Sequence, residues 1–203
     1  LCLESEAATA LGFRLARAID EAESGSKEAH LLERILTPVA KYWNCKRAPG
    51  FVAECVECHG GNGFVEEQPM PRLYREAPLN GIWEGTGNLV CLDVLRAMQK
   101  EPDTVAALLA ELGEARGADE RLDTAIDALE TELSDLRDQE LRARYIAAMI
   151  ATVFEAALLV KHSTPAVADA YVVSRLDGIA NRAFGNLPRG LDLPAIVERS
   201  RLQ

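Results

Sequence analysis

The residues best suited to chemistry lie between Ile82 and Asn88, where the chain reads Ile-Trp-Glu-Gly-Thr-Gly-Asn. Glu84 stands directly before Gly85-Thr86-Gly87, a pattern that predicts a helix start with Thr86 as the N-cap. A carboxylate in a dry pocket has its pKa raised towards the working range of a general base. The backbone N–H groups that follow could hold a phosphate or diphosphate at the same helix start. The alternative for Glu84 is an ordinary solvated loop acid.

A second candidate segment is glycine-rich and reads Gly60-Gly61-Asn62-Gly63. Glycine lets a backbone approach a ligand closely or adopt a positive φ. Residues 60–81 are then expected to form a long loop, and a loop of that length inside a compact domain is usually functional or disordered. Its aromatic and charged residues favour a functional loop. Arg72, Arg75 and Glu76 in this loop are read either as part of a site or as simple salt bridges.

A third pattern, Cys55-Val56-Glu57-Cys58-His59, matches the attachment motif of a c-type haem. Haem attachment normally takes place outside the cytoplasm, and the sequence shows no export signal. A zinc site is the other alternative, but these residues lack a second pair of ligands. The interpretation that we prefer is two half-buried thiols at a helix end, with no metal bound.

Composition and periodicity predict an all-α protein built as a helical bundle. Apolar residues make up 48% of the chain and aromatic residues only 5%, and no stretch alternates with period two. A helix-breaking Glu101-Pro102-Asp103 predicts a boundary between a domain at 1–100 and a second helical domain at 101–203. Pro38 predicts a kink or break, and 46–50 a connection. Helices are expected at 3–24, 26–45, 51–58, 87–100, 104–112, 119–136, 139–161, 165–183 and after Pro194.

The charge balance is acidic, with a net charge of −10 over 203 residues. Residues 101–203 contribute −7 of it, which argues against nonspecific nucleic-acid binding. Five cysteines, an odd number, fit a reducing cytoplasm better than a disulfide framework. We find no apolar run of the roughly 18 residues that span a bilayer, so no membrane partner is expected. The chain opens on Leu1 without a Met, which predicts a fragment of a longer protein.

Three motifs in this order resemble the C-terminal helical domain of the acyl-CoA dehydrogenases. They are Gly60-Gly61-x-Gly63-Phe64, Arg72-x-x-Arg75-Glu76 and Ile82-Trp83-Glu84-Gly85-Thr86. The stretches 73–78, 82–88 and 91–96 are most similar to the AidB branch, flavoproteins of the adaptive response to alkylation damage. Residues 101–203 are similar, by length and position, to the extra C-terminal helical domain of that branch.

The resemblance implies an FAD-dependent α,β-dehydrogenation of acyl-CoA thioesters. Glu84 falls on the catalytic base, which removes the α-proton while hydride leaves the β-carbon for the flavin. Trp83 stands where a Tyr is usual and would crowd the acyl pocket. Asn88 would contact both cofactor and substrate. The remaining positions that the resemblance assigns to cofactor binding are Ile82, Trp83, Gly85, Thr86, Gly87, Gly60 and Gly61.

The resemblance also implies partners. A homotetramer is the family expectation, and the flavin site would need further domains and a partner subunit, so residues 1–203 alone are expected to be inactive. The alternative function is that of an AidB-like protein that binds double-stranded DNA through its C-terminal domain and protects it from alkylation. The charge of −7 over 101–203 does not support DNA binding.

Overall fold

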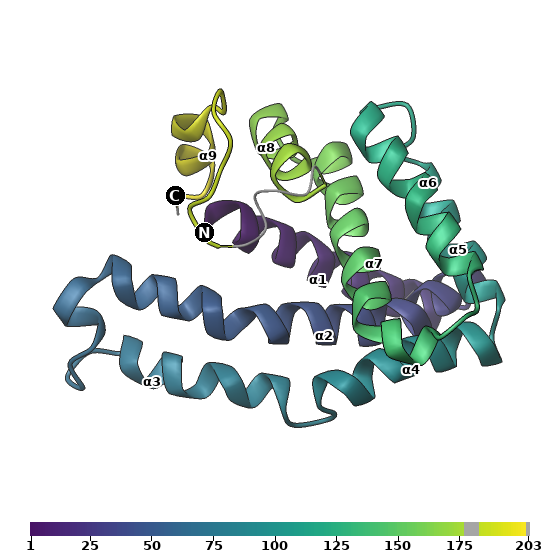
Figure 1. Cartoon of the computed structure of the whole chain (residues 1–203), viewed down its shortest axis with the longest axis horizontal. Coiled ribbons are helices and arrows are strands. Elements are labelled where there is room, and N and C mark those ends of the chain that lie inside the picture. Colours follow the sequence, from purple (N-terminus) through teal and green to yellow (C-terminus); the bar gives the residue numbers. More distant parts are fainter. Residues whose placement is uncertain (177–182, 202–203) are drawn as a thin grey trace.

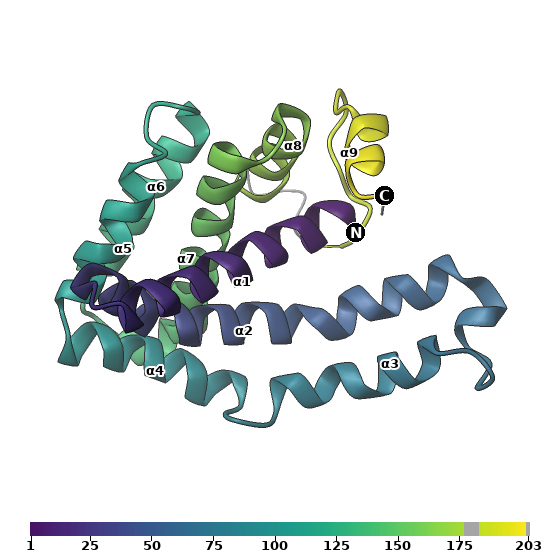
Figure 2. The same ribbon diagram turned by 180° about the vertical axis from the view of Figure 1, so that it is seen from behind.

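In the computed structural model, residues 1–176 and 183–201 are described, and they form helices and no strand, which confirms the all-α prediction (Figures 1 and 2). The predicted helix at 165–183 is confirmed as far as Arg175, and its positions 177–182 lie outside the described residues. The elements are α1 Cys2–Glu23, α2 Lys27–Cys58, η1 Gly60–Gly63, α3 Met70–Glu76, η2 Ala77–Gly81, α4 Gly87–Lys100, α5 Asp103–Gly113, α6 Glu120–Ser134, α7 Gln139–His162, α8 Pro165–Arg175 and α9 Leu193–Arg199, where η denotes a 3-10 helix.

The turn between α1 and α2 follows the predicted signals. Gly25 has φ +99°, a left-handed conformation that glycine adopts at little cost. Ser26 is the N-cap of α2, and its hydroxyl oxygen accepts a hydrogen bond from the Ala29 N–H at 3.1 Å. The two helices therefore reverse direction where the sequence indicates.

Helix α2 is continuous over 32 residues, so the connection predicted at 46–50 is wrong, and of the kink or break predicted at Pro38 the break does not occur. A proline inside a helix costs about 3 kcal/mol, because it lacks an N–H and crowds the preceding turn. Burial of an aliphatic side chain stabilises by roughly 1.5–3 kcal/mol. The apolar face of α2 is buried on the N-terminal side of Pro49, through Leu32, Ile35, Leu36 and Val39. That burial outweighs the two prolines, Pro38 and Pro49.

Residues 60–81 are not the uninterrupted loop that the sequence predicted, because they contain η1, α3 and η2. Pro71 lies in the first turn of α3, where the ring presets φ and no N–H is missed. Pro78 plays the same part in η2. These elements run back along α2, so that α3 and α4 lie on one side of α2 while α6, α8 and α9 lie on the other (Figure 1).

Helix α7 is central to the core and packs against α1, α2, α4, α6 and α8. Among the described residues it is the one helix with the length and apolar composition of a membrane span, a feature that the sequence analysis missed. Its most apolar window is 72% buried inside the protein. Neighbouring helices therefore already bury most of the apolar surface of α7. The division of the chain into two domains at Glu101 stays a prediction.

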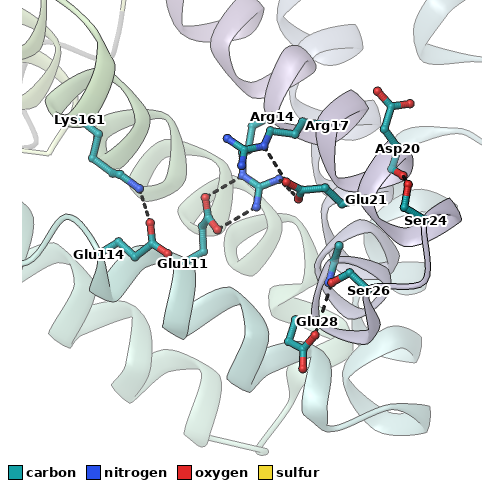
Figure 3. A network of polar contacts seen from close by, with 11 residues as sticks. Arg14, Arg17, Asp20, Glu21, Ser24, Ser26, Glu28, Glu111, Glu114 and Lys161 are labelled. Carbon is teal, nitrogen blue, oxygen red and sulfur yellow. Dashed lines mark hydrogen bonds and ion pairs between the residues drawn. The ribbon is translucent and has the colours of Figure 1, made fainter.

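Ion pairs tie α5 to its neighbours (Figure 3). The Arg14 guanidinium of α1 donates two hydrogen bonds to Glu111 of α5, at 2.7 and 2.9 Å. These bonds lower the pKa of the Glu111 carboxyl. Lys161 near the end of α7 donates to Glu114 at 2.5 Å. The first pair is mostly buried and so contributes more to stability than an exposed pair would.

A buried carboxylic acid, Glu155, links three helices in the core. Glu155 of α7 is 3% exposed, and its carboxylate accepts hydrogen bonds from Trp43 Nε1 of α2, at 3.0 Å, and from the Tyr171 hydroxyl of α8. Burial raises the pKa of Glu155 from 4.5 to about 7, against the opposing effect of these two hydrogen bonds. The folded protein therefore holds a proton on Glu155 in a pH range where the unfolded chain has released it.

We predict that this proton makes the free energy of unfolding fall as the pH rises from about 5 to about 7, by an amount on the order of 2–3 kcal/mol. Glu155→Gln keeps the shape and cannot ionise, so the variant should lack this decline. Urea unfolding at several pH values measures it. Glu111 does not interfere, because its lowered pKa makes its contribution fade only in more acidic solution. Equal pH slopes for the variant and the wild type between pH 5 and 7 would contradict the assignment.

Candidate functional site

Glu84 lies at the top of a strained turn between η2 and α4. It has φ +58°, a left-handed conformation that it shares with only one other non-glycine residue in the described part of the chain, Asp138. Gly85 follows with φ +121°, and a Cβ built there would lie 3.0 Å from Cγ2 of Val90. Glycine is therefore required at 85. The pair of unusual backbone conformations turns the chain sharply and leaves the Glu84 side chain on the outside.

Helix α4 begins at Gly87 with Thr86 as the N-cap, as the sequence predicted. The Thr86 side chain nevertheless accepts no capping hydrogen bond. The first N–H groups of an α-helix have no partner inside the helix, and together with the helix dipole they attract anions. The start of α4 is therefore open to an anionic ligand beside Glu84.

Arg144 of α7 is a residue of this site that sequence reasoning missed. Its Nε donates to Oδ1 of Asn88 at 2.7 Å. A Cβ on Gly87 would lie 3.4 Å from the Arg144 guanidinium and 3.5 Å from the Tyr42 ring, so glycine allows both to pack against the helix start. Arg144 therefore adds positive charge beside the start of α4. It lies 56 residues after Asn88, and no spacing rule in the sequence relates the two.

A cavity of about 550 Å³ adjoins the turn and includes Glu84, Gly85 and Leu89 in its lining. Its other wall is α2, where the Lys41 ammonium donates to the Asn80 carbonyl oxygen at 2.6 Å and so fixes η2 against α2. The basic side chain of Arg34 also lines the cavity, held by Asp93 at 3.1 and 3.2 Å. The cavity has a volume typical of a small-molecule site.

Ile82, Trp83 and Glu84 are all exposed, with 59% and 54% of the two apolar side chains accessible. The dry pocket expected around Glu84 is therefore not formed by the described residues of this chain. The expected surroundings otherwise hold: an apolar edge precedes the carboxylate and a glycine-bounded helix start follows it. A carboxylate in this position is placed to meet a molecule that comes from outside.

Gly60 and Gly61 lie far from Glu84, at the free end of α2 (Figures 1 and 2). The stretch of α2 from Lys41, beside the Glu84 turn, to Cys58, beside η1, is roughly 25 Å long. Gly63 is fixed by sterics, because a Cβ there would lie 2.3 Å from the Val56 carbonyl oxygen. The structure brings 82–88 together and places Gly60–Gly61 elsewhere, so the predicted cofactor residues form two separate groups on one chain.

The Cys55-x-x-Cys58-His59 pattern lies at the end of α2. Nδ1 of His59 is 2.7 Å from the Cys55 carbonyl oxygen and carries the proton of that hydrogen bond. Cys55 is half-buried, which raises the pKa of its thiol, and Cys58 is exposed. Across 1–176 and 183–201, no three His, Cys, Asp or Glu side chains lie close enough together to hold a metal ion.

The charged residues of 72–76 form exposed salt bridges, which is the simpler of the two interpretations from the sequence. Arg72 lies 3.9 Å from Glu76, and Arg75 lies 2.6 Å from Glu66. Exposed pairs of this kind contribute about 0–1 kcal/mol.

Comparison with known proteins identifies this arrangement of helices. Residues 1–99 match the family model of the acyl-CoA dehydrogenase C-terminal domain. The chain is also 41% identical to the putative acyl-CoA dehydrogenase AidB of Escherichia coli (strain K12), over 87% of this chain and 32% of that protein. The chain belongs to the acyl-CoA dehydrogenase family.

Two further comparisons, one with a sequence and one with a solved structure, also extend the similarity beyond residue 99. The acyl-CoA dehydrogenase family member 11 of Caenorhabditis elegans is 33% identical over 75% of this chain and 28% of that protein. The crystal structure of ACDH-11 of the same organism, in complex with C11-CoA, has a TM-score of 0.67 and 31% identity, over 86% of this chain and 33% of that one. The chain thus spans about a third of the length of these relatives.

We predict that Glu84→Gly raises the free energy of unfolding by roughly 0.5–1 kcal/mol, because glycine removes the left-handed strain and loses only part of that gain to backbone entropy. Ala106→Gly, on the exposed face of α5, is the matched control and should lower it by about 1 kcal/mol. Chemical denaturation of both variants measures the difference. If both substitutions destabilise equally, the turn at Glu84 does not have this conformation in solution.

Proposed function

We propose that this chain supplies the catalytic base, and part of the cofactor and thioester surface, of an FAD-dependent acyl-CoA dehydrogenase-like flavoprotein. The observation that carries the proposal is the placement of Glu84. Its carboxylate stands between a cavity of about 550 Å³ and the open start of α4, on a turn that two left-handed residues hold in place. Family membership supports the same reaction class, an oxidoreductase acting on acyl-CoA.

The residues around α4 fit the diphosphate part of a nucleotide cofactor. Thr86 leaves the first N–H groups of the helix uncapped, and Arg144 adds a guanidinium beside them. Gly85 and Gly87 let Val90, Arg144 and Tyr42 pack closely against the turn and the helix start. Thr86, Gly87 and Asn88 would therefore hold an anionic group of FAD. When bound, the flavin supplies the acceptor for a hydride from the β-carbon of the substrate.

Glu84 is the group that would take the α-proton of the thioester. It is exposed at the rim of the cavity, with no ion-pair partner among the described residues, so its carboxylate is free to meet the acidic Cα–H. The base must stand on the opposite side of the thioester plane from the hydride acceptor, so that both bonds break in one aligned geometry. The electron pair left by the proton then forms the Cα=Cβ double bond as the hydride departs.

The substrate class in the proposal is acyl-CoA. ACDH-11, which shares 31% identity with this chain, was solved with C11-CoA. Ile82 and Trp83 offer an exposed apolar edge next to Glu84 on which an acyl chain could lie. Arg34 on the facing wall is already bound to Asp93. Among the described residues, Lys41 donates only to a neutral carbonyl oxygen, so its ammonium is the group of that wall that could meet a phosphate of coenzyme A.

In the proposed enzyme, other parts of the polypeptide or other subunits must complete the site around Glu84. Glu84 is exposed, and base catalysis of this kind works best where water is excluded. Exposed apolar side chains continue from the Glu84 turn along η2 and α3 to η1, and we propose that sister subunits of a homotetramer cover them. These residues are Phe64, Leu73, Tyr74, Leu79, Ile82 and Trp83. Gly60 and Gly61 would then serve the flavin site of a neighbouring copy, and residues 1–203 alone would be inactive.

DNA protection, the alternative that the similarity to AidB raises, is not favoured by any observation here. Residues 101–203 carry 11 basic against 18 acidic side chains. Duplex DNA binding draws most of its affinity from the neutralisation of phosphates by basic side chains. The acidic balance opposes it.

We predict that Glu84→Gln lowers the rate of flavin reduction by acyl-CoA at least about 100-fold in the FAD-loaded holoenzyme, because the amide cannot accept the α-proton. Stopped-flow bleaching of the flavin absorbance, with a series of acyl chain lengths, measures the rate. Glu76→Gln, which removes an exposed carboxylate of α3, is the matched control and should react like the wild type. Unchanged flavin content with wild-type bleaching in Glu84→Gln would show that another group is the base.

A further inference from the structure

A second cavity, of about 560 Å³, lies between α6, α7 and α8 and has Trp43 of α2 in its wall. It shares no lining residue with the cavity beside Glu84. Figure 1 places α6 and α8 on the side of α2 opposite to α3, away from the Glu84 turn. The proposed dehydrogenation does not use this space.

Most of the wall is apolar, and small side chains create the room. The lining includes two alanines of α6 and one of α7, at positions where larger side chains would fill the cavity. The volume lies within the range of sites for small organic molecules. The apolar lining consists of Ala125, Ala128, Ala148, Met149, Val153 and Leu176.

Arg175, at the end of α8, places a poorly compensated charge in this wall. Its side chain is only 9% exposed, and its buried Nε has no hydrogen-bond partner among the described residues. Its terminal nitrogens make only long contacts, 3.4 Å to Glu4 and 3.5 Å to the Ser174 hydroxyl. Both carboxylate oxygens of Glu4 already accept hydrogen bonds from Arg47, one from its Nε and one from its Nη2. Arg175 and Arg47 therefore share the one carboxylate of Glu4, and the charge of Arg175 is only partly compensated. A partly compensated buried cation is costly, and a negatively charged ligand would relieve that cost.

The other arginine of the cavity is already neutralised. Arg121 donates to Asp119 at 2.6 Å and to Asp169 at 2.8 Å. Tyr145, 57% exposed, and the exposed Thr124 line the cavity on its solvent side and mark an entrance. The cavity therefore combines a solvent-exposed entrance, an apolar wall and one guanidinium, that of Arg175, whose hydrogen-bond donors are not all used by the described residues.

From this combination we infer that the cavity between α6, α7 and α8 binds an amphipathic monocarboxylate, with its carboxylate on Arg175 and its apolar part along the alanines of α6 and α7. A guanidinium presents a planar pair of donors that matches a carboxylate. A single guanidinium that is only partly compensated by Glu4 favours a monoanion. The site is a binding site outside the dehydrogenase chemistry, and it holds whether or not Glu84 is a base.

Isothermal titration calorimetry with octanoate tests the inference, with octan-1-ol as the uncharged probe of equal chain length. Octanoate should bind, and octan-1-ol should bind at least about tenfold more weakly. Arg175→Gln should weaken octanoate about tenfold and leave octan-1-ol unchanged. Arg17→Gln, at an exposed arginine of α1, is the matched control and should bind octanoate like the wild type.

A second variant locates the ligand. Ala148→Phe fills the cavity from α7 and should abolish octanoate binding, whereas Ala106→Phe, exposed on α5, should not. If Ala148→Phe does not fold, Ala125→Leu fills the same space from α6. Binding can also be followed through the fluorescence of Trp43 in a Trp83→Phe background, which removes the other tryptophan of the chain.

Three results would overturn the inference. They are no octanoate binding at millimolar concentration, equal affinity for octanoate and octan-1-ol, and equal octanoate affinity in Arg175→Gln and the wild type. Failure of the Glu84→Gln test would leave the calorimetry unaffected, because the two cavities have no residue in common.

Discussion

Burial of one face of α2 is the constraint on which both cavities depend. The helix continues through Pro38 and Pro49 because the apolar contacts of its first half outweigh the hydrogen bonds that the prolines omit. Its continuity then fixes three distant features along one axis. Lys41 holds the turn that carries Glu84, Trp43 closes the wall of the second cavity, and the C-terminal end presents Gly60 and Gly61.

Backbone strain is concentrated where the chemistry is proposed. A left-handed conformation at a non-glycine residue costs roughly 1–2 kcal/mol, so surrounding contacts must hold the residue in that conformation. At Glu84 that support comes from both sides: Lys41 anchors η2 before the turn, and Arg144 and Tyr42 pack against Gly87 after it. A relaxed turn would cost less, but it would not hold the carboxylate at the rim of the cavity.

Local signals in the sequence were enough to predict much of this chain. Period-3.6 apolar patterns, with Ser26 and Thr86 as caps, located α1, the start of α2 and α4. The stretch 82–88 could be recognised as a candidate site from the sequence, because its features are contiguous: a carboxylate is followed by two glycines on either side of a cap residue. The cofactor and base roles of these residues stay predictions.

Features that depend on distant contacts could not be predicted. The prolines of α2 indicated that the helix is interrupted. The helix is continuous because neighbouring helices pack against its apolar face, and the local sequence does not show that packing. The proline-rich 60–81 segment indicated a loop, although prolines in the first turn also start short helices such as α3 and η2. Arg144 and Arg175 looked like ordinary basic residues of helices. Their surroundings come from side chains more than 50 positions away, at Asn88 and Glu4.

The polar residues of α7 show how the C-terminal half of the chain supports the first half. Most of the apolar window of helix α7 is buried, so a polar side chain that the helix carries must find a partner or reach water. Arg144 contacts Asn88 of α4, Glu155 contacts Trp43 of α2, and Lys161 contacts Glu114 at the C-cap of α5. Because Arg144 also packs against Gly87, the position of α7 sets the position of the α4 start, and with it the electrostatic environment of Glu84. A substitution that shifts α7 therefore acts on the candidate site without touching any residue of the turn itself.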